Sequence, residues 1–269
     1  NAQRRRGPKE RGRKGRRIAR ATSTVDAPPY ITRKIPVYEL ASEELLALVE
    51  ENTEIVLEEI GIDFRDDPQA LQLFRDAGAL VEEERVRFPR GMCREIIQRN
   101  APNEFTQHAR NPDRSVQIGG DHAVFVPAYG PPFVRDLDSG RRYATIEDFI
   151  NFTKLTWMSP ALHHSGGTLC EPVDVPVNKR HLDMIYSHLR WSDKPFMGSV
   201  TAPERAQDTV DMAEIVFGRS FVDSHCVITS LINANSPMTF DATMLGAARV
   251  YAEHNQATVI SPFILAGAM

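Results

Sequence analysis

The sequence predicts an α/β fold built from repeated strand–helix units, and three observations support this prediction. Short apolar runs alternate with amphipathic stretches from about residue 121 onward, which is typical of right-handed βαβ units in a parallel sheet. The glycine-rich turns GxGxxG and GxxxxGK[ST] of nucleotide-binding sheets are both absent. The segments that follow the predicted strands are rich in small and polar residues, as at the C-terminal face of a barrel. We therefore expect a TIM-type (β/α)8 barrel.

Residues 35–120 are expected to form an α+β cap that precedes the barrel. Leucine, valine and isoleucine recur at helical spacing over 42–60, with Ser42 as a predicted N-cap and Gly61 as the stop. Further helices are predicted over 68–77 and 89–100, and short strands over 104–108 and 116–118.

Residues 121–269 are expected to form the first part of the barrel. Strands are predicted over 123–126, 161–165, 196–200, 225–231 and 257–260, and helices over 145–157, 178–191, 203–217 and 237–254. Thr145 is a predicted N-cap, with Asp148 at the third helical position. About five strands are too few to close an eight-stranded barrel, so we expect a truncated sequence with an open edge.

The N-terminal segment differs from the rest of the chain in charge. Residues 1–20 hold ten Arg and Lys and a single acid, Glu10, whereas the whole chain has net charge −4, so residues 21–269 carry −13. A block of like charge without apolar periodicity predicts a disordered tail over 1–34. An RNA-binding arm is the functional alternative, but the acidic body argues against a dedicated nucleic-acid binder.

Composition favours a cytoplasmic protein without a membrane anchor. No apolar run reaches the ~20 residues that span a bilayer, and the basic start is not followed by the apolar stretch of a signal peptide. Cys93, Cys170 and Cys226 form no CxxC pair, so neither a disulfide framework nor a zinc ribbon is expected.

Five stretches of the sequence resemble the trimethylamine methyltransferase family. They are VRDLDSGRRYAT (134–145), PVDVP (172–176), DKPF (193–196), NSPM (235–238) and SPFILAGA (261–268). Their order and spacing are similar to those of the family from about residue 35 to the end. The resemblance implies a TIM barrel of roughly double this length, of which this chain is the N-terminal half.

The resemblance also implies transfer of a methyl group from a methylated amine to a corrinoid. The corrinoid would be carried by a cognate partner protein, with no cofactor bound covalently to this chain, and a homo-oligomer is expected. Archetypal members act on trimethylamine and carry pyrrolysine in the second half of the barrel. Relatives without pyrrolysine are similar to demethylases of glycine betaine and other quaternary amines. The position that separates the two groups lies beyond Met269, so the sequence leaves the amine open.

A methylated ammonium group would need aromatic faces and a carboxylate, because cation–π attraction reaches ~2 kcal/mol when the pair is desolvated. Tyr129 and Phe133 follow the first predicted strand and Phe263 follows the fifth, so these aromatic residues are candidates for the substrate site. Glu171 and Asp174 are the candidate carboxylates in the loop after the second strand. Packing beneath a loop and simple solvation are the respective alternatives.

His163 and His164 end the second predicted strand and are the candidate catalytic residues, for acid–base chemistry or for anchoring the substrate. Neighbouring residues on a strand point to opposite faces, so one of the two is expected to face the barrel interior. A core histidine hydrogen-bonded to the main chain is the structural alternative. A hydrolase or lyase that uses one of them as its base is the functional alternative.

Polar residues at the ends of the third and fourth strands could hold a substrate carboxylate. Asn233, Asn235 and Ser236 precede a predicted helix, whose N-terminus favours anions. Ser199 and Thr201 occupy the corresponding place after the third strand. Helix capping is the alternative for each of them.

A zinc-dependent methyltransferase is a further alternative. Cys170 and Cys226, together with His163 or His225, offer the right ligand types. They have no HxH, HExxH or CxxC spacing, so no metal is expected.

Overall fold

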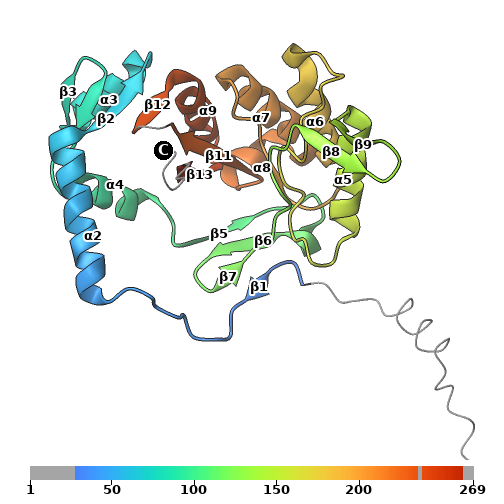
Figure 1. The fold of residues 1–269 in the computed structure, drawn as a ribbon, viewed down its shortest axis with the longest axis horizontal. Helices are drawn as coiled ribbons and strands as arrows, with labels where there is room; N and C mark the ends of the chain where they lie inside the picture. The colour runs from blue at the N-terminus through green and yellow to red at the C-terminus, as the bar shows by residue number, and fades with distance from the viewer. Residues whose placement is uncertain (1–27, 236–237, 263–269) are drawn as a thin grey trace, which may run out of the picture.

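The computed structural model describes residues 28–235 and 238–262. Within these ranges the chain has a mixed α/β architecture with four separate sheets (Figure 1). No helix in them is long and apolar enough to cross a bilayer. Most of the predicted basic tail over 1–34 lies outside the described residues.

An antiparallel sheet with the order β1-β7-β6-β5 runs below the rest of the fold in Figure 1. Its strands are β1 (Ile31–Thr32), β5 (Glu104–Gln107), β6 (Val116–Gly119) and β7 (His122–Ala123). Gln107 at the end of β5 is fully buried, and its side-chain amide donates to the carbonyls of Phe196 at 2.9 Å and Val227 at 3.2 Å. The end of β5 therefore closes off the point where two of the parallel strands begin.

The remaining N-terminal elements form a small α+β layer. They are α2 (Glu43–Ile55), a π-helical turn (Val56–Ile60), α3 (Pro68–Ala77), α4 (Met92–Asn100), β2 (Ile62–Arg65), β3 (Leu80–Glu82) and β4 (Arg85–Arg87). The Ser42 hydroxyl accepts from Leu45 N at 3.3 Å, which confirms the predicted N-cap. Gly61 ends the helical stretch with a φ of 76°. The prediction for α4 began too early, because Gly91 precedes the helix with a φ of 78°.

A parallel sheet in chain order, β10-β11-β13, forms the centre of the fold. Its strands are β10 (Phe196–Met197), β11 (Ile228–Ala234) and β13 (Ala257–Pro262), and the main helices between and beside them are α6 (Val177–Trp191), α7 (Pro203–Phe217) and α9 (Ala242–Glu253). A short helix, α8 (Arg219–Ser224), follows α7. The three helices α6, α7 and α9 pack side by side in the order of the chain (Figure 1). The last three predicted strands are thus confirmed as consecutive parallel strands joined by helices, although β10 is shorter than predicted and β11 lies three residues later.

The first two predicted barrel strands were wrong. His122 and Ala123 belong to β7 of the antiparallel sheet, and 161–165 forms no strand. A ladder needs a run of backbone bonds, whereas here His163 N donates to Phe125 O (2.9 Å) and Ser165 N to Pro195 O (2.7 Å). Through these bonds the 123–126 segment lies beside the 161–165 segment, which in turn lies beside the start of β10, so the three follow one another in the order of the chain. The described residues contain no closed barrel, so the complete barrel stays a prediction.

Residues 133–143, for which no helix or strand was predicted, form the hairpin β8 (Phe133–Asp136) and β9 (Gly140–Tyr143). The Asp136 carboxylate accepts from two backbone amides of the turn, and Gly140 has a φ of 67°. The next helix, α5 (Ile146–Met158), begins with the predicted capping box of Thr145 and Asp148.

Three apolar clusters hold these layers together. The largest lies between the parallel sheet and its helices and includes Phe196, Val210, Ile228, Ile232 and Tyr251. A second lies in the N-terminal layer around Phe64, and a third joins the hairpin to α5 around Phe149. Strand β12 (Thr239–Asp241) pairs in parallel with β2, and Phe240 stacks on Phe64 with ring centroids 5.6 Å apart. Strand pairing and ring stacking thereby attach the N-terminal layer to the segment between β11 and α9.

Candidate functional site

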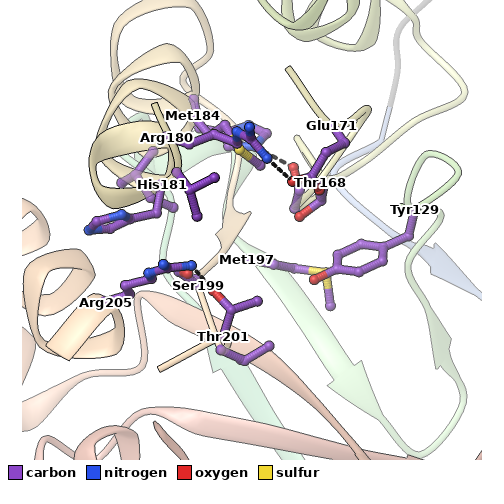
Figure 2. A pocket seen from close by; sticks show the side chains of 16 residues that line it. Tyr129, Thr168, Glu171, Arg180, His181, Met184, Met197, Ser199, Thr201 and Arg205 are labelled. Carbon is purple, nitrogen blue, oxygen red and sulfur yellow. Dashed lines mark hydrogen bonds and ion pairs between the residues drawn. The ribbon is translucent and has the colours of Figure 1, made fainter. Parts of the chain in front are cut away.

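A small cavity of about 90 Å³ lies where the parallel segments turn into their helices. Its walls come from 167–171, which follow the 161–165 segment, and from 197–201 at and after β10. The remaining wall comes from α6 and the first turn of α7 (Figure 2). Ligand sites in α/β proteins lie at the carboxyl ends of parallel strands, because loops and helix N-termini converge there. The volume has room for several waters or a small organic ion.

Three of the predicted substrate-binding residues, Tyr129, Glu171 and Ser199, line this cavity. The Tyr129 ring lies against the backbone of Gly167, where an added Cβ would come within 2.5 Å of the ring. Burial raises the pKa of the Tyr129 hydroxyl, so this group is neutral at physiological pH. Tyr129 therefore offers the cavity an aromatic face and a neutral hydroxyl.

An ion pair between Arg180 and Glu171 occupies one wall of the cavity. Arg180 lies in the first turn of α6, and its Nε and Nη2 also donate to Val175 O at 3.2 and 3.1 Å. The Arg180 side chain is only 16% exposed. The negative charge of Glu171 is thus already compensated within the chain, and it does not stand free to attract a cation.

A second arginine in the cavity has no such partner. Arg205 lies in the first turn of α7, and its Nη1 donates to Thr201 Oγ1 at 2.8 Å. Among the described residues, no carboxylate forms an ion pair with Arg205. Next to it, His181 is bonded through Nε2 to Asp208 at 2.7 Å, while its Nδ1 is buried without a hydrogen-bond partner in the described part of the chain. The cavity wall on this side therefore contains a guanidinium without an ion-pair partner and an imidazole nitrogen without a hydrogen-bond partner, while the Asp208 carboxylate bonds the other nitrogen of the same ring.

The sequence profile of the trimethylamine methyltransferase (MTTB) family matches residues 9–269. The chain belongs to this family. It is also similar to the glycine betaine methyltransferase of Desulfitobacterium hafniense (strain Y51), with 46% identity over 234 residues, which are 87% of this chain and 48% of that protein. The resemblance of the five sequence stretches is thereby confirmed. The chain spans about half the length of the curated relative that it matches.

The two histidines predicted as catalytic lie outside the cavity of this trimethylamine methyltransferase family member. His163 Nδ1 accepts from Phe125 N at 2.9 Å, and burial, together with the Lys194 charge, lowers its pKa. His164 is fully buried; its Nδ1 accepts from Gly166 N at 2.8 Å and its Nε2 faces Gln107 Oε1 at 3.1 Å. A catalytic role for either stays a prediction, and this geometry favours the alternative of hydrogen-bonded core histidines.

Two further candidates lie near the hairpin rather than in the cavity. Phe133 is in β8, with the Arg141 guanidinium 3.9 Å from its ring centroid. Asp174 accepts from Ile146 N at 2.9 Å at the start of α5. Phe133 is held there by the pairing of β8 with β9, and Asp174 by its bond to the first turn of α5.

The candidates in and after β11 do not line the cavity either. Asn233 lies in β11 opposite Ser261 of β13. Asn235 donates to Asp241 Oδ2 at 2.8 Å and spans the turn into β12. The predicted helix start at 237 was wrong, because Asp241 is the N-cap of α9. Ser236 and Phe263 lie outside the described residues.

Sequence reasoning missed two arginines and a histidine of the site, Arg180, Arg205 and His181. The missed signal was their position, because the helices predicted over 178–191 and 203–217 place all three in a first turn. First-turn side chains of such helices lie beside the carboxyl ends of the strands. A cationic substrate predicts aromatic and acidic side chains in its site, and an arginine is neither.

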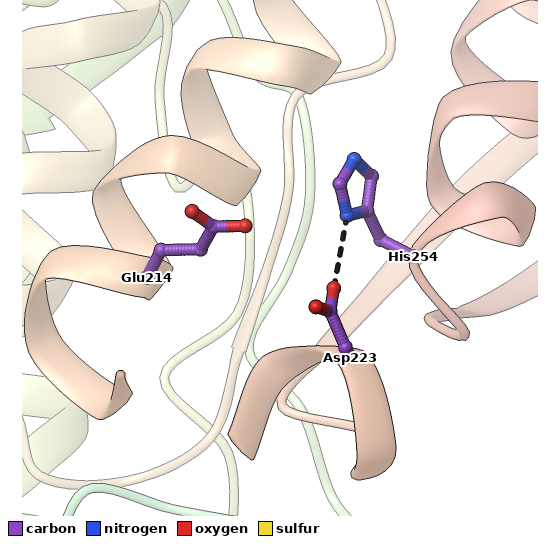
Figure 3. A group of neighbouring side chains, drawn as sticks. All are labelled: Glu214, Asp223 and His254. Atoms are coloured by element: carbon purple, nitrogen blue, oxygen red, sulfur yellow. Dashed lines mark hydrogen bonds and ion pairs between the residues drawn. The ribbon is translucent and has the colours of Figure 1, made fainter. Parts of the chain in front are cut away.

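One group of potential metal ligands occurs among the described residues, and it lies far from the cavity along the helices. Glu214, Asp223 and His254 bring one ligand atom each within 4.8 Å of one another near the C-terminal ends of α7, α8 and α9 (Figure 3). Arg219 Nε lies 3.8 Å from the Glu214 carboxylate and 3.9 Å from that of Asp223. The guanidinium thus balances the acidic charge that a cation would otherwise compensate.

The residues of the zinc alternative do not form a comparable group within the described ranges. Burial raises the pKa of the Cys170 thiol to about 12 and that of Cys226 to about 11. Cys226 Sγ donates to Ile228 O at 3.3 Å. A zinc ligand must be a thiolate, so these environments disfavour a zinc site.

Proposed function

We propose that the intact protein transfers a methyl group from a methylated amine to a corrinoid protein, with a quaternary amine such as glycine betaine as the donor. The similarity to a glycine betaine methyltransferase, 46% identity across 87% of this chain, carries the proposal. The cavity at the carboxyl ends of the parallel segments supports it, because its lining combines an aromatic face with polar and charged groups.

The size of the cavity fits a corrinoid that is supplied by a partner protein. About 90 Å³ accommodates a small amine but not a corrin macrocycle. When present, the reduced corrinoid supplies the nucleophile that accepts the methyl group. The carbon–nitrogen bond breaks, and its electron pair remains on the nitrogen of the departing tertiary amine.

The role of this chain would then be to hold the methylated nitrogen in line with the acceptor. The Tyr129 ring supplies a face that attracts a quaternary ammonium group without a proton transfer. Met197 and Gly167 complete the wall beside this ring, and both Tyr129 and Met197 pack closely on the Gly167 backbone. Orientation of this kind contributes most of what a binding site can add to such a displacement.

We further propose that the three parallel strands belong to a TIM barrel, with residues 35–120 as its α+β cap, 1–34 as a basic tail and 121–269 as the first part of the barrel. The chain-order parallel arrangement of β10, β11 and β13 supports this proposal. The coverage of 48% of the relative is in agreement with a barrel completed by a further stretch of chain.

The test is methyl transfer by the intact, full-length protein. The protein is incubated with its cognate corrinoid protein in the reduced state and with glycine betaine, trimethylamine or other methylated amines, and the absorption spectrum of the corrinoid is followed. We expect the spectrum of the methylated corrinoid to appear with a quaternary amine and not without the protein. Absence of methylation with every tertiary and quaternary amine would refute the proposal.

A further inference from the structure

We propose that Arg205 binds a carboxylate of the substrate, so that the cavity selects a methylated amine that also carries a carboxylate. This inference rests on the proposed function in one respect: the ligand is taken to be a methylated amine at its other end. The carboxylate contact itself follows from the charges, donors and burial of the cavity.

The balance of charge in the cavity is the first argument. Glu171 is neutralised by Arg180, whereas Arg205 has no ion-pair partner among the described residues and bonds through its side chain to the Thr201 hydroxyl alone. The cavity therefore presents one uncompensated positive charge. A bare ammonium ion would be repelled there, and the repulsion grows as water is excluded. A zwitterion would supply the missing negative charge.

The donor geometry around Arg205 is the second argument. Arg205 stands two positions after Pro203, at the start of the 15-residue helix α7, where backbone N–H groups and the helix dipole favour an anion. A guanidinium is a planar fork of N–H donors that matches a carboxylate in two parallel bonds. Its bond to Thr201 uses Nη1 and leaves further N–H groups for a ligand.

The buried His181 ring is an independent indication that a polar ligand binds here. His181 lines the same cavity, is only 7% exposed, and has no partner for Nδ1 in the described part of the chain. Buried polar atoms are nearly always hydrogen-bonded in native proteins. Nε2 donates to the Asp208 carboxylate, so Nδ1 of the neutral ring is an acceptor, and an ordered water that donates to it and bridges to the ligand is expected beside this nitrogen. Figure 2 shows His181 and Arg205 on one side of the pocket and Tyr129 on the other.

The cavity thus has two ends of different chemistry. Arg205, Thr201 and His181 form a polar, cationic end, and Tyr129 with Met197 forms an aromatic and thioether end. A carboxylate at the first end and a methylated ammonium group at the second would each meet groups that stabilise it. An amine without a carboxylate would occupy only the second end.

The experiment measures binding by calorimetry in the intact protein without any corrinoid partner. Glycine betaine is compared with tetramethylammonium, which has the same cationic head and no carboxylate. We expect Arg205→Gln to weaken glycine betaine binding at least tenfold. Tetramethylammonium binding should not weaken in this variant and should become tighter, because the charge that repels a bare cation is removed. Arg205→Lys keeps the charge but loses the fork, so we expect an intermediate loss. Arg219→Gln, an exposed arginine outside the cavity, is the matched control, and thermal unfolding verifies that each variant is folded.

The inference is overturned if the wild type binds glycine betaine no better than tetramethylammonium, or if Arg205→Gln affects both ligands equally or neither. The proposed function can fail separately. A protein that binds glycine betaine through Arg205 but never methylates the corrinoid would refute the function and support this inference. Methyl transfer from glycine betaine that is unaffected by Arg205→Gln would support the proposed function and refute this inference.

Discussion

At the scale of single residues, His164 and His188 are two buried, neutral imidazoles, and His188 is part of the cavity wall. His188 Nδ1 accepts from Ser165 Oγ at 2.7 Å, and its Nε2 donates to Gly167 O at 2.8 Å. Both ring nitrogens of each histidine are thus bonded in the neutral form. Burial lowers the pKa of His164 to about 3 and that of His188 to about 4.

These low pKa values predict that the protein loses stability in mild acid. An unfolded histidine titrates near 6.5, so between about pH 6.5 and pH 4 the unfolded state binds protons that folded His188 does not. The free energy of unfolding therefore falls as pH falls through this window, by an amount on the order of 3 kcal/mol for His188 alone. Urea unfolding of His188→Gln at several pH values should show a shallower dependence on pH than the wild type.

The matched control for this prediction is Ser165→Ala. It removes one hydrogen bond to His188 but keeps the titratable ring. We expect it to lower stability at every pH while keeping most of the dependence on pH, because burial, the main cause of the low pKa of His188, is left in place. Equal slopes for His188→Gln and the wild type would show that this histidine does not cause the acid sensitivity.

At this scale, the sequence predicted part of the site. Tyr129, Glu171 and Ser199 line the cavity, because residues that follow neighbouring parallel segments converge, and their roles in binding stay predictions. His163 and His164 were placed at a strand end that does not form, and their hydrogen bonds depend on Phe125 and Gln107, which are distant in sequence. No pattern within a short window of sequence could have shown these partners.

At the scale of elements, the start of α5 joins a helix cap to the hairpin. Asp148 accepts from Thr145 N at 2.8 Å as part of the capping box, and it also takes two bonds from the Arg142 guanidinium of β9. The hydrogen bond from Arg142 and those from Thr145 hold the pKa of the Asp148 carboxyl well below its usual range. One carboxylate therefore stabilises the start of α5 and also holds the neighbouring hairpin in position.

Removing this carboxylate should destabilise the protein more than removing the cap alone. We expect Thr145→Ala to lower the free energy of unfolding by about 1 kcal/mol. Asp148→Asn should cost more, roughly 2–3 kcal/mol, because it also leaves the partly buried Arg142 without its main partner. Glu147→Gln, an exposed acid of the same turn, is the control. A loss in Asp148→Asn no larger than in Glu147→Gln, measured by urea unfolding, would contradict this account.

The elements differ in how far the sequence predicts them, for a physical reason. Helices α3 and α7 begin and end at the predicted residues, since their apolar spacing, prolines and glycines act within the helix itself. Strand β12 was missed because it forms only by pairing with β2, about 175 residues earlier in the chain. The 161–165 segment failed as a strand because it has too few backbone bonds to its neighbours, which its own sequence does not reveal.

At the scale of the whole molecule, two apolar surfaces of the described chain lack a covering layer. One is the edge of the parallel sheet at β13, where Val259 is 47% and Ile260 is 57% exposed. Ile260 is in register with Ile232 of β11, which is fully buried against the helices. The two side chains lie on the same face of the sheet, so Ile260 occupies the position that a helix after β13 would cover. The other surface is α2, where Leu45, Leu46, Leu48 and Val49 are about half exposed.

These surfaces predict opposite effects of one substitution in two contexts. Produced alone, residues 1–269 should associate through the unpaired edge and the exposed apolar side chains, since an open strand edge is a template for pairing. Ile260→Lys places a charge on that edge and should increase the monomeric fraction of this piece in sedimentation. In the intact protein the same lysine would be buried, and we expect it to lower the free energy of unfolding by several kcal/mol.

Two outcomes would mean that nothing packs on β13. One is cooperative unfolding of the isolated piece as a monomer, and the other is an Ile260→Lys substitution that leaves the free energy of unfolding of the intact protein unchanged. The barrel proposal would then lose its main support from the structure, while the family membership, which rests on the sequence comparisons, would stand.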